Sequence, residues 1–314
     1  MRDRNGMRVL AALLALGGSL LLAACKPRDR REGSVPDRET VGRDPVRFLL
    51  LGCDRAASLT DSILLVSVTP SVGDFRILQI PRDTYAAYTE RDYRKLNGAY
   101  HALGADGTRD WLSSALGVPI DRVAVFDLDC LRRAVDAVGG VEVEIETPMH
   151  YLDPAQGLTI DLPVGRQHLD GGMAEQFARY RAGYADADLG RLDAQKQFLA
   201  AFLQACAALT PTEAIRVCGA VLPSVQTDLP FGEAVGLALS LLRSEEQTAE
   251  IRTAPGEAVR GQSGAWYYVL NREGMTDALA WWSGETPQFD AARLFDRAEN
   301  TEFHRIYEAS SAAP

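Results

Sequence analysis

Val46-Arg47-Phe48-Leu49-Leu50-Leu51-Gly52 begins the part of the chain in which apolar residues gather into short runs. The run is apolar apart from one arginine and ends at a glycine, a pattern typical of a buried strand. A second apolar run occupies residues 63–68, and a third occupies residues 75–80. A proline, a glycine and an aspartate separate these two, so we predict that they form a hairpin.

The next segments combine strand and helix patterns. Residues 123–128 predict another strand, and Leu131–Val138 has helical spacing that stops at Gly139-Gly140. Val141–Ile145 then alternates apolar and acidic residues, as a half-exposed strand does.

Two further helices are predicted downstream. Asp170 has the character of a helix cap before residues 173–177, and Phe231–Leu242 has a second helical pattern. Strands mixed with helices in this order predict an α/β fold with a central mixed β-sheet flanked by helices, an α-β-α architecture.

The start of the chain indicates export. Three arginines within the first eight residues precede an apolar stretch from Val9 to Ala24, which is short for a membrane span. The stretch ends in Leu22-Ala23-Ala24-Cys25, which resembles a bacterial lipobox. We therefore expect a signal peptide at residues 1–24, a lipidated Cys25, and a protein at the extracellular face of the cytoplasmic membrane. The alternative is an uncleaved signal anchor.

The remaining chain divides by composition. Residues 25–44 are charged and rich in glycine and proline, and we predict a flexible tether. Residues 45–285 are long enough for a catalytic domain with a sizeable core, and residues 286–314 form a polar tail. The net charge of -10 argues against nucleic acid as a partner.

Four cysteines remain beyond Cys25. Cys206 and Cys218 flank a helix end and a turn, which allows one disulfide outside the cell. Cys53 and Cys130 are better interpreted as small buried residues, and the same interpretation stays open for the other two. No CxxC pair suggests a zinc site.

Arginines gather in one short segment of this acidic chain. Arg179 and Arg181 are two residues apart, so they converge only if the backbone is extended or lies at a helix end. Asp188, Arg191 and Gln195 have the spacing of one helix face. Because guanidinium groups bind phosphate well, this segment predicts a phosphate or pyrophosphate ligand. The alternative is a solvated surface with local ion pairs.

Carboxylates lie near the ends of the predicted strands. Asp54 follows the first strand, and Asp61 lies just before the second. Two such groups suit Mg²⁺, or Mn²⁺, which completes its shell with water and phosphate oxygens. Arg82-Asp83 follows the third strand. Each residue alone is more often a turn or capping residue, but together with the arginines they predict a cation-plus-arginine clamp on a diphosphate.

Seven motifs in order resemble those of the LytR-CpsA-Psr family. The likeness runs from about Val46 to about Leu203 and weakens towards Trp282. The motifs are Phe48-Leu49-Leu50-Leu51-Gly52-Cys53-Asp54, Thr60-Asp61-Ser62, Ile80-Pro81-Arg82-Asp83-Thr84, Lys95-Leu96-Asn97-Gly98-Ala99-Tyr100, Val138-Gly139-Gly140-Val141, Arg179-Tyr180-Arg181, and Asp188-Leu189-Gly190-Arg191 with Gln195.

This resemblance implies an extracytoplasmic phosphotransferase. Such enzymes move a glycopolymer, such as teichoic acid or capsule, from a polyprenyl-pyrophosphate carrier onto peptidoglycan. The resemblance implies that Asp54 and Asp61 bind Mg²⁺ and that Gln195 supports the substrate. It assigns catalytic positions to Arg82, Asp83, Arg179, Arg181 and Arg191, the arginines binding pyrophosphate and the aspartate having an open role. The family's lipid tunnel would be lined by residues such as Leu64, Val66, Ile77, Phe198 and Phe202, which are also ordinary core residues.

One departure from the family pattern concerns Leu59. The family has an arginine two residues before the position of Asp61, and Arg55 is a hypothetical substitute that binds the same phosphate. The alternatives are therefore a polyprenyl-pyrophosphate binding protein and a hydrolase that uses water as acceptor. A DNA-binding regulator conflicts with the signal segment and the acidic charge, and the four histidines fit no nucleophile motif.

Overall fold

The computed structural model describes residues 45–54, 59–88, 95–154, 157–181, 187–244, 248–261, 264–288 and 294, with backbone alone at residue 54 and residues 187–191. The chain divides into two compact units. The sheet unit comprises residues 47–67, 76–125 and 250–314, and the helical unit comprises residues 1–46, 68–75 and 126–249.

A six-stranded sheet is formed by the described residues in the order β10-β3-β2-β1-β4-β9. This mixed sheet, with its accompanying helices, confirms the predicted α/β class. The strands are β1 (Val46–Asp54), β2 (Leu59–Thr69), β3 (Asp74–Ile80), β4 (Arg122–Phe126), β9 (Gln226–Thr227) and β10 (Thr248–Thr253).

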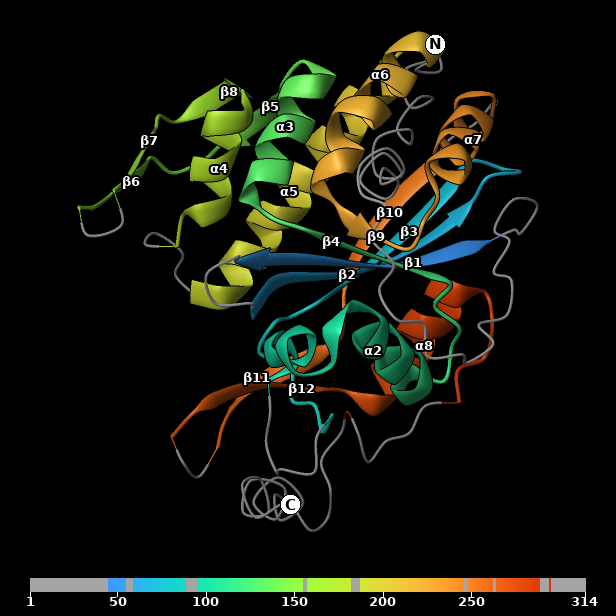
Figure 1. Cartoon of the computed structure of the whole chain (residues 1–314). Helices are drawn as coiled ribbons and strands as arrows, with labels where there is room; N and C mark the ends of the chain where they lie inside the picture. The colour runs from blue at the N-terminus through green and yellow to red at the C-terminus, as the bar shows by residue number, and fades with distance from the viewer. Residues whose placement is uncertain are drawn as a thin grey trace, which may run out of the picture. The chain divides into compact units, whose positions relative to one another are not determined.

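The other elements are helices, short 3₁₀ turns and three antiparallel hairpins (Figure 1). The hairpins are β5 (Val141–Ile145) with β8 (Gly165–Leu169), β6 (Met149–Asp153) with β7 (Leu158–Leu162), and β11 (Gly256–Arg260) with β12 (Trp266–Leu270). The helices are η2 (Leu96–Gly98), α2 (Ala99–Leu116), α3 (Leu128–Val138), α4 (Gly171–Arg179), α5 (Ala187–Ala207), α6 (Pro211–Val221), η3 (Leu222–Ser224), α7 (Phe231–Leu242) and α8 (Arg272–Ser283).

The predicted hairpin of the second and third runs is confirmed, because β2 and β3 are neighbours in the sheet. The amides of Val72 and Gly73 both donate to the carbonyl of Thr69, and Gly73 has φ 69°. A residue with a Cβ is strained in that left-handed conformation, which explains the glycine at this turn.

Local signals also predict α3, but it begins at Leu128 rather than at Leu131, and the preceding strand is bounded differently. The strand expected over residues 123–128 ends at Phe126, because the Asp127 side chain accepts from the amide of Cys130 and caps α3. Gly139 ends the helix with φ 89°, as predicted. The alternating burial of β5 confirms a half-exposed strand.

The core of the sheet unit lies between the strands and helices α2 and α8, which cover the same face of the sheet (Figure 1). Alternate strand residues enter this core, as the pleat requires. The intervening residues of β1, β2 and β3 are buried as well, which accounts for apolar runs without alternation. The core includes Leu49, Leu51, Ile63, Leu65, Leu78, Ile80, Leu112, Leu116, Val123, Val125, Leu279 and Trp282.

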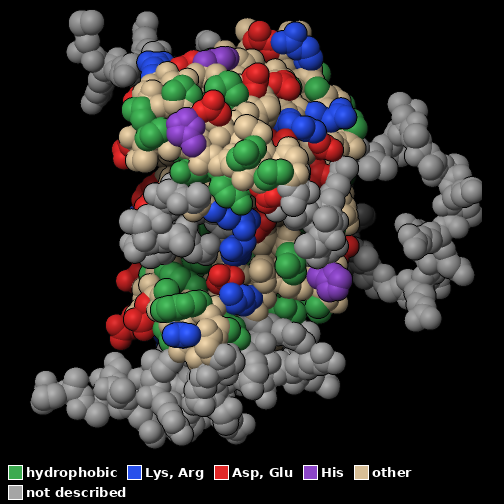
Figure 2. Space-filling view, turned by 90° about the vertical axis from the view of Figure 1, so that its left-hand side faces the viewer, with side chains coloured by type: hydrophobic (Ala, Val, Ile, Leu, Met, Phe, Trp, Pro, Cys, Tyr) green, Lys and Arg blue, Asp and Glu red, His purple; other side chains and the backbone are tan. Residues whose placement is uncertain are grey.

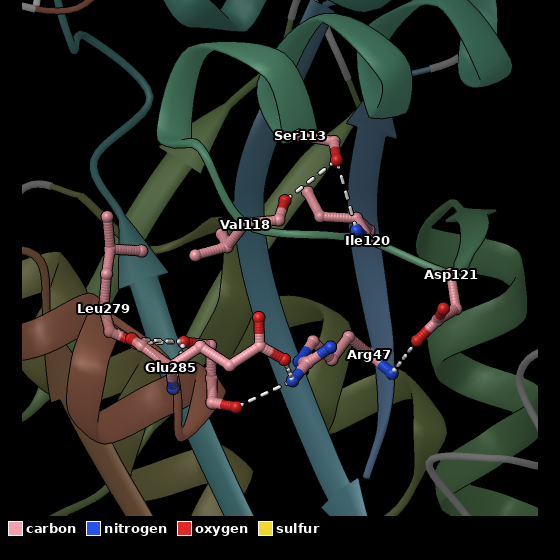
Figure 3. Close-up of polar contacts among 8 residues, drawn as sticks. Arg47, Ser113, Val118, Ile120, Asp121, Leu279 and Glu285 are labelled. Atoms are coloured by element: carbon pink, nitrogen blue, oxygen red, sulfur yellow. Dashed lines mark hydrogen bonds and ion pairs between the residues drawn. The ribbon is translucent and has the colours of Figure 1, made fainter. Parts of the chain in front are cut away.

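A buried arginine joins the first strand to the end of α8 (Figure 3). Arg47 is 7% exposed, and its Nη2 donates to the carbonyl of Ser283 over 2.8 Å and pairs with Glu285 at 2.6 Å. Its amide donates to Oδ2 of Asp121 over 2.9 Å, and the amide of Asp121 donates to the carbonyl of Arg47. Segments far apart in the sequence therefore meet at Arg47, one through its side chain and the other through its backbone.

Within the helical unit, α3 packs against α4, α5 and α6. The approach of α4 to α3 is close, since a Cβ at Gly171 would lie 2.4 Å from the carbonyl oxygen of Arg132. The amide of Gly171 donates to Oδ1 of Asp136 over 2.8 Å. Asp170 caps α4 by accepting from the amide of Met173, as predicted from the sequence.

None of the four described cysteines is in a disulfide, so the bridge that the spacing of Cys206 and Cys218 allows is not formed. Cys130, Cys206 and Cys218 are buried, and Cys53 is half-buried. Burial raises the pKa of Cys218 to about 11, which keeps its thiol protonated and unreactive at neutral pH.

Candidate functional site

The Arg82-Asp83 turn lies directly after β3 and is held by backbone contacts. The amide and hydroxyl of Thr84 both donate to the carbonyl of Pro81, at 3.0 and 2.6 Å. The amide of Asn97 donates to the carbonyl of Arg82 over 3.0 Å. These bonds fix the turn, and they therefore fix the backbone from which the Arg82 and Asp83 side chains extend.

Arg82 and Asp61 are brought together in the sheet unit. Nη1 of Arg82 donates to Oδ1 of Asp61 over 2.5 Å, and both side chains remain partly exposed. The prediction that Asp61 precedes its strand is wrong, because β2 begins at Leu59. The strand starts early because Thr60 is buried and its hydroxyl donates to the carbonyl of Asn97 over 3.2 Å.

Asp83 is paired with a lysine that the sequence analysis did not single out as a site residue. Nζ of Lys95 lies 3.1 Å from Oδ1 of Asp83 and 5.8 Å from the centroid of the Tyr267 ring. The amide of Tyr268 donates to the carbonyl of Asp83 over 2.9 Å. The β11–β12 hairpin therefore supports the turn that carries two predicted catalytic residues.

The residues present fit a magnesium ion whose coordination shell is completed by oxygens of the substrate. Asp61 offers a partly exposed carboxylate, and Asp54 is the last residue of β1. Among the described residues no three His, Cys, Asp or Glu side chains gather as a ligand set. Mg²⁺ needs only one or two carboxylates when phosphate oxygens and water complete its shell.

In the helical unit, Arg179 and Arg181 lie at a helix end. This is one of the two backbone arrangements in which their side chains can converge. Arg179 is the last residue of α4, and Tyr180 leaves the helix with φ -67° and ψ 131°. Arg181 is exposed, and Arg179 is partly exposed. Nη1 of Arg179 donates to Oε1 of Glu175 over 3.3 Å.

The remaining predicted site residues lie on α5 or outside the described residues. Gln195 is half-buried on α5, and Arg191 lies four residues earlier on the same helix, with only its backbone described. Arg55 and Cys25 fall outside the described residues. The structure therefore brings Arg82 to Asp61 in the sheet unit, and in the helical unit it places Arg179 and Arg181 at the same helix end.

Stacked aromatic rings connect the two helices that carry these residues. The Phe177 ring on α4 stacks on Phe198 of α5 with centroids 6.0 Å apart, and Phe198 stacks on Phe202 at 6.4 Å. Phe202 is buried, as are Leu64, Val66 and Ile77 of the sheet unit. The end of α4 is therefore fixed relative to α5.

Sequence reasoning missed Glu175 and Arg132 beside Arg179. Nη1 of Arg132 donates to Oε2 of Glu175 over 3.1 Å. The spacing of Glu175 and Arg179, four residues on one helix, is a signal that could have shown the first contact. No sequence signal points to Arg132, because it lies on α3 and meets Glu175 only through helix packing.

Chemically, both units present guanidinium groups that remain accessible next to fixed carboxylates. Such groups bind phosphate oxygens and stabilise the charge that phosphoryl transfer spreads over them. Figure 2 shows basic, acidic and histidine side chains interspersed on one face of the molecule. Within the described residues, no helix is both long and apolar enough to cross a membrane.

Comparison with known proteins identifies the family of the chain. The chain belongs to the LytR_cpsA_psr family, whose model matches residues 23–280. The match extends past Leu203, where the stronger resemblance was expected to end.

Relatives and solved structures agree with this assignment. The polyisoprenyl-teichoic acid–peptidoglycan teichoic acid transferase TagU of Bacillus mycoides is 27% identical over 252 residues, which cover 77% of this chain and 79% of that protein. The structure of TagV from Bacillus subtilis has a TM-score of 0.66 at 23% identity and covers 78% of this chain and 99% of its own. TagT bound to LIIa-WTA has a TM-score of 0.65 at 24% identity, with coverages of 82% and 95%.

Proposed function

We propose that this protein is a lipid-anchored extracytoplasmic phosphotransferase that moves a glycopolymer from a polyprenyl-pyrophosphate carrier onto peptidoglycan. Family membership and the names of the teichoic acid transferases among its relatives support the reaction class. The observation that carries the proposal is the accessible pair Arg179 and Arg181 at the end of α4, a geometry suited to a doubly phosphorylated ligand.

The proposed reaction uses the arginines to bind and orient the pyrophosphate. We assign Arg82, Arg179, Arg181 and Arg191 to its oxygens, with Gln195 as a further polar contact. A hydroxyl of the acceptor sugar forms a new O–P bond with the phosphorus that carries the glycopolymer. The bridging P–O bond breaks, the lipid phosphate leaves, and the hydroxyl proton passes to solvent. Charge spreads over the phosphate oxygens, where fixed guanidinium groups stabilise it.

Asp54 and Asp61 are the residues that would hold Mg²⁺, or Mn²⁺, which neutralises charge on the phosphates when bound. In the structure Asp61 binds Arg82, so its carboxylate already lies beside a residue that we assign to the pyrophosphate. A lipid on Cys25 would hold the protein at the extracellular face of the cytoplasmic membrane.

Three possible outcomes of one experiment distinguish the proposed function from its alternatives. Purified protein is incubated with Mg²⁺, a polyprenyl-pyrophosphate-linked glycopolymer and peptidoglycan, and the products are separated by mass. We expect glycopolymer bound to peptidoglycan. Free lipid phosphate without attachment would indicate a hydrolase, and retention of intact carrier would indicate a binding protein; either result contradicts the proposal.

The presence of Leu59 favours the two alternative functions, a binding protein and a hydrolase. Leu59 is 39% exposed at the start of β2, two residues before Asp61, where the family pattern has an arginine. A missing guanidinium at that place would weaken turnover more than lipid binding.

We expect Arg55 to replace the missing charge. Arg55→Ala should then lower transfer by about tenfold or more, the scale of one oriented electrostatic group. Transfer rates at saturating carrier measure the effect, and Arg216→Ala on the exposed face of α6 is the control. Unchanged pyrophosphate binding and turnover in Arg55→Ala would show that Arg55 has no such role.

A further inference from the structure

One carboxylate in the helical unit is shared between two arginines. Glu175 accepts from Arg179 through Oε1 at 3.3 Å and from Arg132 through Oε2 at 3.1 Å. Arg132 also pairs with Asp129 on its own helix. Each oxygen of Glu175 therefore has its own guanidinium partner, and a chain of alternating charges runs from α3 to the end of α4.

The packing of α3 against α4 fixes this arrangement. Gly171 allows the backbone of α4 to approach the carbonyl of Arg132, and its amide is held by Asp136. Glu175 lies one helical turn from that contact and one turn before Arg179. The order of Glu175 and Arg179, acid before base at four residues, is the favourable one on a helix.

The Glu175 side chain differs from a surface ion-pair member in its burial. It is 20% exposed, whereas Glu142, which pairs with Arg166 at 3.0 Å on the β5–β8 hairpin, is 47% exposed. A charge contact that is less solvated is screened less and holds its partner more firmly. Helix support alone does not require the second arginine, which lies on another helix.

We propose that Glu175 is a positioning residue that holds the Arg179 guanidinium in place and is exchanged for a pyrophosphate oxygen when the ligand binds, with Arg132 setting how strongly it competes. This inference rests on the proposed function, because it assigns the ligand of Arg179. Arg132 binds the same carboxylate. It therefore offsets part of the Glu175 charge, and the attraction between Glu175 and Arg179 becomes weaker. The pyrophosphate then displaces the Glu175 carboxylate, whose charge Arg132 has partly neutralised.

The two side chains should therefore have opposite effects on ligand binding. Glu175→Gln removes the competing charge, and we expect the Kd for inorganic pyrophosphate to fall about threefold to tenfold, the scale of a partly buried charge contact. Arg132→Met leaves the full Glu175 charge on Arg179, and we expect the Kd to rise by a similar factor. Calorimetry with inorganic pyrophosphate and Mg²⁺ measures both.

Matched controls separate this effect from a change in net charge. Glu142→Gln and Arg166→Met make the same substitutions in an exposed cluster of the same unit, where Glu142 contacts both Arg166 and His168. We expect each Kd to stay within about twofold of the unmodified protein. If Glu175→Gln binds pyrophosphate no more tightly than Glu142→Gln does, or if Arg132→Met does not weaken binding, the inference is overturned.

A second readout is independent of the ligand. The rate at which phenylglyoxal modifies Arg179, followed by mass spectrometry, reports how firmly its guanidinium is held. We expect Glu175→Gln to raise this rate by about threefold or more, and Glu142→Gln to leave it unchanged. An unchanged Arg179 rate in Glu175→Gln would overturn the positioning role even if pyrophosphate binds.

The two readouts also separate this inference from the proposed function. If the unmodified protein binds no pyrophosphate, the proposed function fails, and the exchange step fails with it. A raised Arg179 modification rate would still support the positioning role in that case. Folding of each variant is checked by its thermal unfolding, which the conservative glutamine and methionine replacements should leave within a few degrees of the unmodified protein.

Discussion

Replacement of Arg179 by alanine is expected to lower glycopolymer transfer by about 10²- to 10³-fold, the cost of removing one preorganised donor at a developing charge. Arg179 is the last residue of α4. Glu175 binds its guanidinium, and the stacked Phe177 and Phe198 rings hold the end of the helix in place. The Arg179 guanidinium is held in place before the ligand arrives and, on binding, exchanges the Glu175 carboxylate for a pyrophosphate oxygen. Single-turnover transfer from a polyprenyl-pyrophosphate carrier measures the loss.

Two further variants test the reason for this loss. Arg179→Lys keeps the charge but cannot make two parallel hydrogen bonds to phosphate, and it should recover only part of the rate. Arg166→Ala removes an exposed arginine of the same unit and should keep the rate within about twofold, since exposed pairs contribute little. Retention of more than half of the transfer rate by Arg179→Ala would remove this residue from the site.

Replacement of Arg47 by alanine is expected to lower the free energy of unfolding by about 2–4 kcal/mol, since it removes a buried side chain and leaves the buried carbonyl of Ser283 without its partner. Arg47 binds the Ser283 carbonyl and Glu285 from the first strand of the sheet (Figure 3). Glu285 is exposed and becomes hydrated when the pair is lost, so we expect less than the full cost of breaking a buried ion pair. Urea unfolding measures the change.

The matched variant for this experiment is Arg216→Ala, which removes an exposed arginine from α6. Its free energy of unfolding should stay within about 0.5 kcal/mol of the unmodified protein, as is usual at the surface. Equal stability of the two variants would mean that the Arg47 contacts do not hold the end of α8 to the sheet.

Much of the fold follows from local signals in the sequence. Gly139 ends α3 because its left-handed conformation excludes most other residues, and Asp170 caps α4 with its side chain. The apolar runs of β1, β2 and β3 are continuous because those strands are buried on both faces. Each of these features depends on neighbouring residues, which is why the chain alone predicts them.

Other elements were missed for physical reasons. α2 contains Gly104, which departs from helical geometry with φ 72°, so the helical pattern is interrupted within it. α6 has a recognisable start, since Thr210 and Glu213 form a capping box, and this signal was overlooked. β2 begins at Leu59 because of a contact between Thr60 and Asn97, which are far apart in the sequence.

The site shows the same division between local and tertiary information. The two-residue spacing of Arg179 and Arg181 left two backbone arrangements open, an extended segment or a helix end, and the structure has the helix end. The pairs Arg82–Asp61 and Lys95–Asp83 join segments separated along the chain, and no periodicity shows such contacts. The predicted roles of all the site residues remain predictions, and the side chains of Asp54, Arg55, Arg191 and Cys25 also lie outside the described residues.

A crystal structure of the protein with a polyprenyl pyrophosphate and Mg²⁺ tests the central claim most directly. We predict that Arg82 of the sheet unit and Arg179 of the helical unit both lie within hydrogen-bond distance of the same pyrophosphate. A ligand that contacts only one of these guanidinium groups, or binds away from both, would contradict the proposed site.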